Sequence, residues 1–489
     1  MKATTLLIFA ALLLTLAAYW RTPEYDEAYS LFLTAGHARP VWPAGVFTAG
    51  SVRGFFSGRA SFAAIAANLK SLDVHPPLYF WTLEIWRRWV GPSWFAARML
   101  SVSFSVAALA LVGRIAARTA RPVLPAMAFT LLSYGFAYTG ILARNFALAQ
   151  VLALLGVALL LSAARRGRAD RALAGGLALG AASFTNYLAS FIGAAMLLWL
   201  ALRRDRRPML APAAAGFGLF LVLFDLPFFL AQHAARPGQF APFSWHHAAF
   251  LLVRDAGAAL FGGLPLYAGA AAPLVALLLF LLFATCLTAA WKPDSSPFPL
   301  LAAAPPVGLL LLGLVFDSTP VEIRYLAFSL PFLGLFLAPL RGRLLAPLLA
   351  AQALAVVGLI GAAATMQPQA FAAHMAARHP GTLALVPFGN DGVGVPGPFI
   401  AAAPDRQQIE LLRGPLPDLG AADRNIVLAT PGADAASRAS AATALAALLK
   451  NPCFKDKEEA ATRAATLFAD RCADQHRERN DQLSAIDPD

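Results

Sequence analysis

Long apolar segments alternate with short polar ones along most of this chain. Many of the apolar segments reach the roughly 17–25 residues that an α-helix needs to cross a bilayer. They can be threaded through a membrane so that nearly every dense arginine cluster falls on one side, which is the arrangement of cytoplasmic loops. The expected spans are residues 4–20, 95–113, 123–140, 145–163, 172–186, 188–202, 209–230, 270–290, 298–316, 325–340 and 344–365. The pattern therefore predicts an all-α polytopic membrane protein with about eleven transmembrane helices and a cytoplasmic N-terminus.

Three segments allow a second interpretation. Residues 4–20 have the length and small final residues of a cleaved signal peptide, but the spans that follow favour an uncleaved first helix. Residues 76–90 are expected to form a juxtamembrane or re-entrant helix on the outer side, because a full crossing there would fit the basic flanks less well. Residues 246–264 are expected to lie as an amphipathic piece on the membrane interface.

Two longer polar regions interrupt this pattern. Residues 21–76 form a first loop outside the membrane, and residues 366–489 form a C-terminal region that the odd number of spans also places outside. Within the C-terminal region we expect two buried strands and two alanine-rich helices, at residues 383–386, 426–429, 433–450 and 457–470. The sequence thus predicts a membrane domain over residues 1–365, with its catalytic loop at 21–76, followed by a small α/β periplasmic domain over residues 366–489.

Composition supports a membrane protein and gives no support to nucleic-acid binding. Only 13% of residues are charged, about half the usual fraction for a soluble protein. The net charge of +12 comes from short basic runs between apolar segments, not from one basic patch with interleaved aromatics. Of the three cysteines, Cys286 is expected to be a packed thiol. The question whether Cys453 and Cys472 form a disulfide stays open. No Cys/His spacing typical of a metal site is present.

Ionisable residues gather at the outer ends of the expected spans. Asp26 and Glu27 follow the first span, where a carboxylate can act as general base toward an acceptor hydroxyl. They could instead be a solvated pair in a first helical turn. Asp73 and His75 precede two prolines that suit a helix start, whose exposed N–H groups can meet a phosphate. The alternative for His75 is a capping or interfacial role.

Later outer ends carry further candidates for substrate binding. Arg144 matches phosphate oxygens through its fork of donors, although an arginine there can also snorkel to headgroups. Arg324, between Glu322 and Tyr325, could hold the other side of a phosphate or a donor sugar, and a structural Glu–Arg pair is the alternative. Tyr187 could help to bind the same phosphate or donor sugar, or it could be an ordinary interface aromatic. For Asp225 and Asp317 we favour a structural role.

Five short motifs resemble those of one enzyme group. They are Y-D-E-A-Y-S at 25–30, D-V-H-P-P-L-Y-F-W at 73–81, A-R-M-L-S at 97–101, A-R-N-F-A-L at 143–148 and E-I-R-Y-L at 322–326. In this order they resemble the GT-C superfamily of integral-membrane glycosyltransferases. The likeness is greatest to the branch with protein O-mannosyltransferases, aminoarabinose transferases of lipid A and rhizobial lipid A galacturonosyltransferases. It covers roughly residues 1–345.

The resemblance implies a polyprenyl-phosphate-linked sugar donor and an acceptor outside the membrane. It implies Asp26 as catalytic base, with His75, Arg144 and Arg324 around the lipid phosphate. Some aminoarabinose transferases carry Lys where this chain has His75, so the charge there depends on pH. Ala143 replaces the usual Glu before the arginine of the fourth-helix motif, which weakens a role for a second carboxylate. Some relatives use a divalent cation and others do not, and no ligand set in this chain decides between them.

We therefore expect an inner-membrane glycosyltransferase that moves one sugar to a periplasmic acceptor with inversion at the anomeric carbon. The acceptor could be lipid A, another envelope glycan or a protein. A transporter or flippase for lipid-linked sugars is the rival from another class, but it would need polar residues near the middle of the membrane. A non-catalytic scaffold is the second rival, and it would be expected to lack the carboxylates of the first loop.

Overall fold

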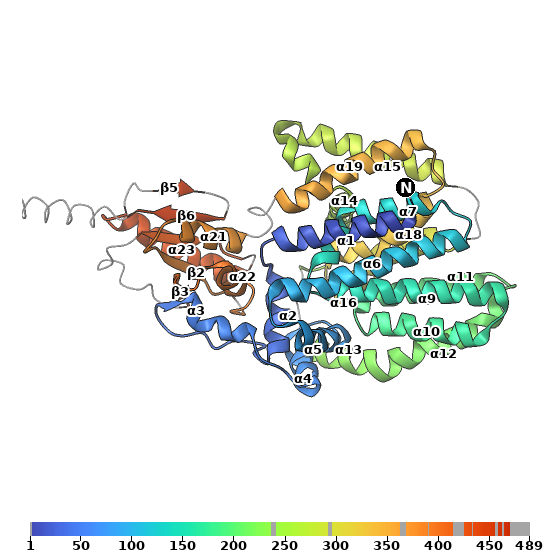
Figure 1. Ribbon diagram of the computed structural model, residues 1–489, viewed down its shortest axis with the longest axis horizontal. Coiled ribbons are helices and arrows are strands. Elements are labelled where there is room, and N and C mark those ends of the chain that lie inside the picture. Colours follow the sequence, from blue (N-terminus) through green and yellow to red (C-terminus); the bar gives the residue numbers. More distant parts are fainter. Residues whose placement is uncertain are drawn as a thin grey trace, which may run out of the picture. The chain divides into compact units, whose positions relative to one another are not determined.

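A computed structural model of the chain forms two compact units (Figure 1). It describes residues 2–235, 241–291, 296–361, 368–389, 391–413, 425–432, 434–454, 458–461 and 464–469. The helical unit comprises Met1–Trp20 and Ser61–Gly361, and the sheet unit comprises Arg21–Ala60 and Ala362–Asp489.

The helical unit is a bundle of helices that differ widely in length. Its first helices are α1 (Ala3–Trp20), α4 (Phe62–Leu72), α5 (Leu78–Val90), α6 (Trp94–Arg118), α7 (Val123–Leu132), α8 (Tyr134–Ile141), α9 (Phe146–Arg166) and α10 (Ala169–Ser183). The middle of the bundle contains η2 (Tyr187–Ala189), α11 (Ser190–Leu202), η3 (Arg207–Met209), α12 (Leu210–Phe220), the π-helical turn η4 (Leu221–Asp225), α13 (Leu226–Ala235) and α14 (Trp245–Phe261). The last part contains η5 (Leu264–Ala271), α15 (Ala272–Ala290), α16 (Phe298–Phe316), α17 (Ile323–Leu326), η6 (Ala327–Ser329), α18 (Leu330–Leu337) and α19 (Gly342–Gly361).

The helices confirm a polytopic membrane protein. Seven helical segments of the described chain are long and apolar enough to cross a membrane, and the pair α7 and α8, bent by 66°, makes an eighth if it is one span. Three shorter apolar helices accompany them, at Phe62–Leu72, Tyr187–Leu202 and Ile323–Leu337. Each of the eleven expected spans overlaps a helix. The two segments expected to stay outside the bilayer core form α5 and α14, which are not among these candidates.

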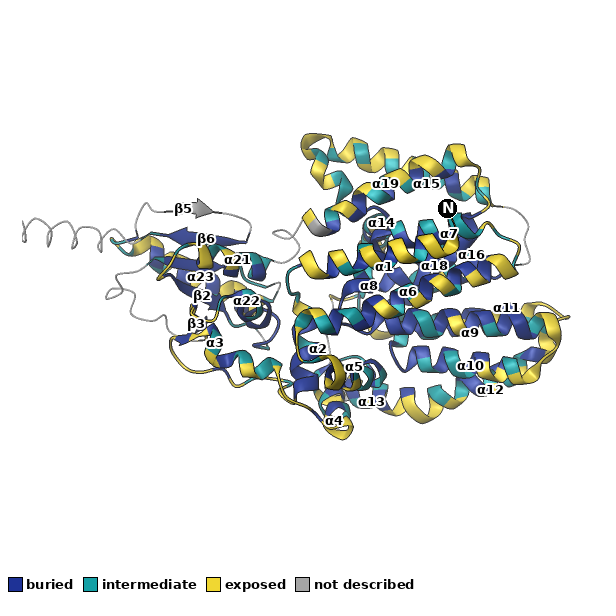
Figure 2. Cartoon of the chain, in the orientation of Figure 1, coloured by how far each residue is buried: buried dark blue, intermediate teal, exposed yellow. Residues whose placement is uncertain are grey.

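Exposure differs sharply between helices of similar apolarity. In an 18-residue window of the candidate span Phe146–Arg166, 78% of the residues are buried, against 6% in such a window of Leu264–Ala290. Figure 2 shows the exposed faces along α15. An apolar helix that is exposed on most sides is stable only when lipid covers it. The span that contains α15 is therefore a lipid-facing helix, whereas α9 forms the centre of the bundle.

Glycines allow α9, α10 and α12 to pack closely. A Cβ at Gly156 or Gly175 would press on the facing helix, and one at Gly176 or Gly216 would overlap the backbone across the α10–α12 contact. Small residues at such crossings let transmembrane helices approach each other and gain van der Waals contact. This packing fixes the ends of α9 and α10 relative to each other, and those ends carry several of the expected site residues.

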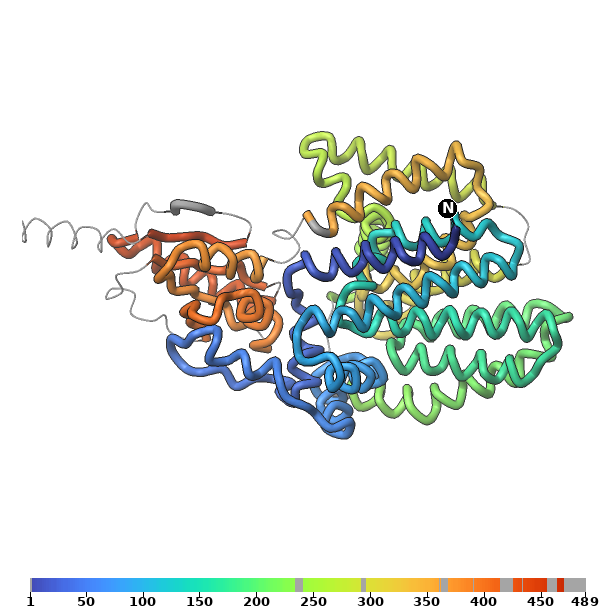
Figure 3. Tube along the Cα trace, in the orientation of Figure 1, coloured from blue at the N-terminus to red at the C-terminus, as the bar shows by residue number. Residues whose placement is uncertain are grey.

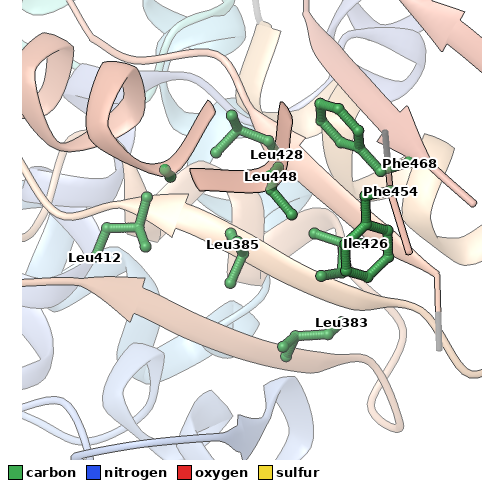
Figure 4. Close-up of a cluster of buried hydrophobic side chains, with 9 residues drawn as sticks. Leu383, Leu385, Leu412, Ile426, Leu428, Leu448, Phe454 and Phe468 are labelled. Carbon is green, nitrogen blue, oxygen red and sulfur yellow. The ribbon is translucent and has the colours of Figure 1, made fainter. Parts of the chain in front are cut away.

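The sheet unit is a small α/β structure, as expected. Its elements are α2 (Tyr25–Ala35), β1 (Phe47–Thr48), α3 (Ala49–Val52), η1 (Arg53–Phe56), α21 (Pro368–Arg378), β2 (Leu383–Pro387), α22 (Pro396–Ala402), β3 (Gln408–Leu412), β4 (Ile426–Ala429), α23 (Ala435–Lys450), β5 (Glu458–Ala461) and β6 (Ala465–Phe468). The strand order is β1-β3-β2-β4-β6-β5, with β3, β2 and β4 mutually parallel. Leu385, Ile426 and Phe468 from the sheet and Leu448 from α23 belong to one buried cluster (Figure 4).

Two features of this unit differ from expectation. The helix expected over 457–470 is wrong, because 465–468 form β6, which pairs antiparallel with β4 and buries Leu467 and Phe468. Pairing with a strand distant in sequence thus overrides the alanine-rich local pattern. The first loop is also divided, because residues 21–60 join the sheet unit, where their blue trace lies beside the orange one in Figure 3. Phe47 of β1 pairs with Ile409 of β3. Cys472 lies outside the described residues, so whether it pairs with Cys453 stays open.

Candidate functional site

Three expected site residues meet in the helical unit. Asp73 caps the end of α4, and Arg144 lies in the short connection between α8 and α9. One Asp73 oxygen lies 3.3 Å from the Arg144 guanidinium, and the other lies 3.5 Å from His75 Nδ1. Arg144 also lies over the Phe80 ring, 5.5 Å from its centre. Asp73 thereby fixes the orientation of a buried guanidinium, which is the group best suited to a phosphate.

Gln232 of α13 connects this cluster to Tyr187. Its side-chain amide donates to the carbonyl oxygens of Leu69 and His75, at 3.0 and 2.9 Å, and accepts from the Tyr187 hydroxyl at 2.9 Å. One side chain therefore connects the last turn of α4 and the segment after it to the start of η2. The sequence analysis did not identify Gln232, although an amide near the end of an otherwise apolar span was a usable signal.

The neighbouring helix ends are also joined by amides. Asn145, at the start of α9, donates to the Thr185 carbonyl at 2.8 Å, and the Asn186 amide lies 3.4 Å from the Asn145 oxygen. Asn186 in turn caps η2 by accepting from the Leu188 amide. The side chains of Asn145, Thr185 and Asn186 are all buried. The backbone that carries Arg144 and Tyr187 is thus held by hydrogen bonds on both sides.

A cavity of about 600 Å³ adjoins these residues. His75, Tyr187 and Tyr325 line it, together with apolar side chains of η4, α13 and α16 such as Phe229 and Leu309. Pockets of roughly 300–1,000 Å³, mostly apolar and with a few placed polar groups, are typical of small-molecule sites. The cavity suits a molecule with one polar end and one long apolar part.

Glu322, Arg324 and Tyr325 lie at the start of α17. The Arg324 guanidinium lies 2.5 Å from Glu322 and over the Tyr325 ring, 5.4 Å from its centre. Tyr325 lies within electrostatic reach of both Arg324 and Arg144. The structure thus brings the late motif to the same region as the Arg144 cluster.

His75 is electrically neutral in this setting. Burial, and then the nearby Arg144 charge, lower its pKa from 6.5 to about 4, although Asp73 acts in the opposite direction. A neutral imidazole carries one donor and one acceptor nitrogen. At neutral pH the cationic charge of the cluster therefore comes from Arg144.

Asp225 also lines the cavity, within the π-helical turn η4. Its carboxylate is buried in the neighbourhood of Ser183. Single π-helical turns inside α-helices occur frequently at functional sites. The sequence analysis favoured a structural role for Asp225, and no sequence pattern marked the π-helical turn.

Asp26 and Glu27 belong to the sheet unit, in the first turn of α2. Glu27 is buried and accepts a hydrogen bond from the Glu24 amide at 3.2 Å, which is one half of a capping box. Asp26 is half-buried. The structure thus gives Glu27 a hydrogen bond that stabilises the helix start, and a catalytic role for either carboxylate stays a prediction.

Asp391 holds α2 from the other end of the sequence. Its carboxylate accepts hydrogen bonds from the hydroxyls of Tyr25 and Tyr29, which flank Asp26 in the first-loop motif. It also accepts from the backbone amides of Val393 and Gly394. Burial alone would raise the pKa of Asp391, but these hydrogen bonds outweigh burial and hold that pKa below its ordinary value.

Gly394 makes this contact possible. A Cβ at position 394 would overlap the Tyr25 ring, so only glycine allows the ring to lie against this backbone. Trp42 adds a hydrogen bond of 2.6 Å to the Gly392 carbonyl. The sequence analysis missed Asp391 because nothing local in D-G-V-G marks it as a partner of residues more than 360 positions away.

Residues that could hold a metal are not grouped in the part of the chain that the structure describes. No set of three or more His, Cys, Asp or Glu side chains in those residues has a suitable arrangement.

Comparison with solved structures identifies the fold. The chain is similar to ArnT from Cupriavidus metallidurans bound to undecaprenyl phosphate, with a TM-score of 0.50 and 14% identity over 95% of this chain and 97% of that one. The apo state of the same protein has a TM-score of 0.48 and 15% identity, with the same coverage. No protein-family model matches the chain, and no curated protein matches it. The likeness to the first of these structures confirms the fold that the sequence motifs predicted.

Proposed function

From the GT-C fold that the chain shares with ArnT, we propose that it is a membrane glycosyltransferase. It transfers one sugar from a polyprenyl-phosphate-linked donor to an acceptor hydroxyl outside the membrane. The observation that carries the proposal is the Arg144–Asp73–His75 cluster beside a largely apolar cavity that His75 itself lines. That pairing suits a phosphate attached to a long hydrocarbon chain, and the solved ArnT structure holds undecaprenyl phosphate.

In this proposal the helical unit binds the donor. Arg144 and Arg324 bind the phosphate oxygens, since a guanidinium pairs with phosphate through two parallel hydrogen bonds. His75, Tyr187 and Tyr325 act as neutral hydrogen-bonding groups around the phosphate or the sugar. The polyprenyl chain occupies the apolar part of the cavity, near Phe229 and Leu309.

The sheet unit supplies the catalytic base. Asp26 accepts the proton of the acceptor hydroxyl as that oxygen attacks the anomeric carbon. The phosphate leaves from the opposite face, so the configuration inverts. Asp391 acts as a positioning residue, because it holds the two tyrosines on either side of Asp26.

The same proposal sets the orientation of the chain in an inner membrane. The N-terminus and the arginine-rich loops lie in the cytoplasm, and both the donor phosphate and the sheet unit lie on the periplasmic side. The acceptor is an envelope lipid, glycan or protein that reaches the site from water.

Mass analysis of envelope glycans tests this function. Cells that make the protein should contain an acceptor heavier by one sugar residue, and cells without the gene, or with only Asp26→Asn, should lack it. Identical glycan masses in all three strains would contradict transfer. Sugar-carrying lipid that accumulates outside without reaching an acceptor would instead identify a flippase.

A further inference from the structure

Six arginines surround a second cavity in the helical unit, of about 1330 Å³. They are Arg118, Arg121, Arg165, Arg206, Arg341 and Arg343. Arg165 lies in the last turn of α9, whereas Arg144 lies two residues before Phe146, where α9 starts. A helix of 21 residues is about 30 Å long. The second cavity is therefore at the other end of α9 from the proposed donor phosphate.

The arginines come from separate places in the sequence. Arg118 ends α6, and Arg121 follows it before α7. Arg206 lies between α11 and η3. Arg341 lies in the turn before α19, and Arg343 lies in the first turn of α19. Positive loops on the cytoplasmic side explain the sign of these charges. They do not explain why charges from distant loops face one cavity.

Neutral groups make several of the contacts that hold these side chains. Arg121 donates to the Ser296 hydroxyl at 3.1 Å, and its guanidinium lies 5.1 Å from the centre of the Phe298 ring. The Arg206 guanidinium lies 4.1 Å from the centre of the Trp199 ring. Such contacts orient a guanidinium without cancelling its charge.

Arginines outnumber acidic residues among the described residues that line the cavity. Among the described residues that line the cavity, Asp205 is the single carboxylate, and its side chain is largely exposed, 3.4 Å from Arg206. Like charges around one cavity repel each other, and a bound anion removes that repulsion. Arginine forks fit phosphate oxygens in particular.

We propose that this arginine cavity binds a phosphate-bearing anion at the face of the bundle opposite the donor site. The same chemistry is offered by the headgroup of an anionic phospholipid and by a soluble polyphosphate. Basic pockets between transmembrane helices on the cytoplasmic side are known to bind such lipid headgroups. The site is separate from sugar transfer and does not depend on it.

Two variants of the full-length chain test the proposal. Arg341→Gln/Arg343→Gln removes two exposed charges of the cavity, so it should fold normally. Arg203→Gln/Arg204→Gln removes two exposed charges on the same side that do not line it. Each purified protein is placed in phosphatidylcholine nanodiscs with or without cardiolipin, and retained lipid is counted by native mass spectrometry. Binding of inorganic pyrophosphate is measured in parallel by calorimetry.

The wild-type protein should retain cardiolipin over phosphatidylcholine, and the cavity variant should lose this preference roughly tenfold or more. The control variant should keep it. Pyrophosphate binding with the same dependence on the variants, but without cardiolipin retention, would support the site and assign its ligand to solution. Equal losses in both variants would show that diffuse surface charge is responsible and would overturn the proposal. So would the absence of both ligands from the wild-type protein.

Discussion

The two halves of the first polar loop are stabilised in different ways. Its beginning is held by residues about 360 positions further along the chain: Asp391 holds α2, which carries Asp26, and β3 pairs with β1. Its end, with Asp73 and His75, is held by helices of the membrane bundle through Arg144 and Gln232. One continuous loop thus contributes to two separately packed units.

Because the two halves of the loop belong to different units, each unit can carry out a different chemical task. In our account the helical unit recognises the donor phosphate, whereas the sheet unit carries and positions the base. Changes in one unit should therefore affect donor affinity, and changes in the other should affect the rate of transfer. The following predictions test that division, beginning with the largest expected effect.

Asp26→Asn should reduce transfer by about 10²- to 10⁴-fold, because an amide cannot accept the proton of the attacking hydroxyl. Donor affinity should not change. The measurement is turnover of a polyprenyl-phosphate-linked sugar, with equilibrium binding of the same donor. Glu27→Gln is the matched control, since a glutamine can still accept from the Glu24 amide in a capping box. Equal losses in both variants would contradict the assignment of Asp26.

Arg144→Ala should weaken donor binding by roughly 10- to 100-fold, because it removes charge-assisted hydrogen bonds to the phosphate. Arg144→Lys should lie between this variant and the wild type, since it keeps the charge but loses the fork. Arg168→Ala, near the opposite end of α9 and paired with Asp170 on the surface, serves as control. Unchanged donor affinity in Arg144→Ala would exclude a phosphate role.

Gly394→Ala should reduce transfer by roughly tenfold, because a Cβ at this position displaces the Tyr25 ring and releases α2 from Asp391. Donor affinity should stay unchanged, which distinguishes this variant from Arg144→Ala. Asp391→Asn should act in the same direction through the two tyrosine hydrogen bonds.

Gly54→Ala controls for the loss of a glycine in the same unit, since a Cβ there meets nothing within 4 Å. It should leave transfer unchanged. If Gly394→Ala weakened donor binding and left turnover intact, the division of tasks between the units would be wrong.

The smallest expected effect concerns pH. With its pKa lowered to about 4, His75 stays neutral, so donor affinity should be flat over roughly the pH 5–8 range in which an ordinary imidazole titrates. A change in donor affinity with a midpoint near pH 6.5 would show that His75 binds the phosphate as a cation.

The lowered pKa of His75 should also make the free energy of unfolding depend on pH. A lowered pKa in the folded state means that the unfolded chain takes up the proton first as pH falls below 6.5. The contribution of neutral His75 is therefore fully present above 6.5 and is lost as pH falls from 6.5 toward 4. Thermal unfolding of the wild type should lose roughly a few degrees over this interval relative to His75→Gln.

Much of the helical unit could be predicted because a bilayer imposes a strong and local pattern. Each expected span overlaps a helix, and Arg144 and Tyr187 lie close to helix ends as expected, just before α9 and at the start of η2. Gln232 escaped notice, since its role depends on which loop carbonyls lie opposite α13. Every residue has a backbone carbonyl, so the residue types at positions 69 and 75 do not identify them as partners of Gln232.

The sheet unit was harder to predict because its strands pair over long distances. Strand β1 has only two residues, and its partner β3 lies some 360 positions later. The alanine-rich residues near 465 favour a helix locally, yet pairing with β4 makes them a strand. Asp391 was missed for the same reason, since only the fold brings it to Tyr25 and Tyr29.

An experimental structure of the full-length Asp26→Asn variant with donor bound in a lipid nanodisc tests the central claim most directly. The distances of interest run from residue 26 to the anomeric carbon and from Arg144 to the donor phosphate. We predict a hydrogen-bonded Arg144–phosphate contact and about 6 Å from residue 26 to the carbon, because about 3 Å separates a base from the acceptor oxygen and about 3 Å separates that oxygen from the carbon it attacks. A donor phosphate bound away from Arg144, or a residue 26 too distant for one hydroxyl to bridge, would contradict the account.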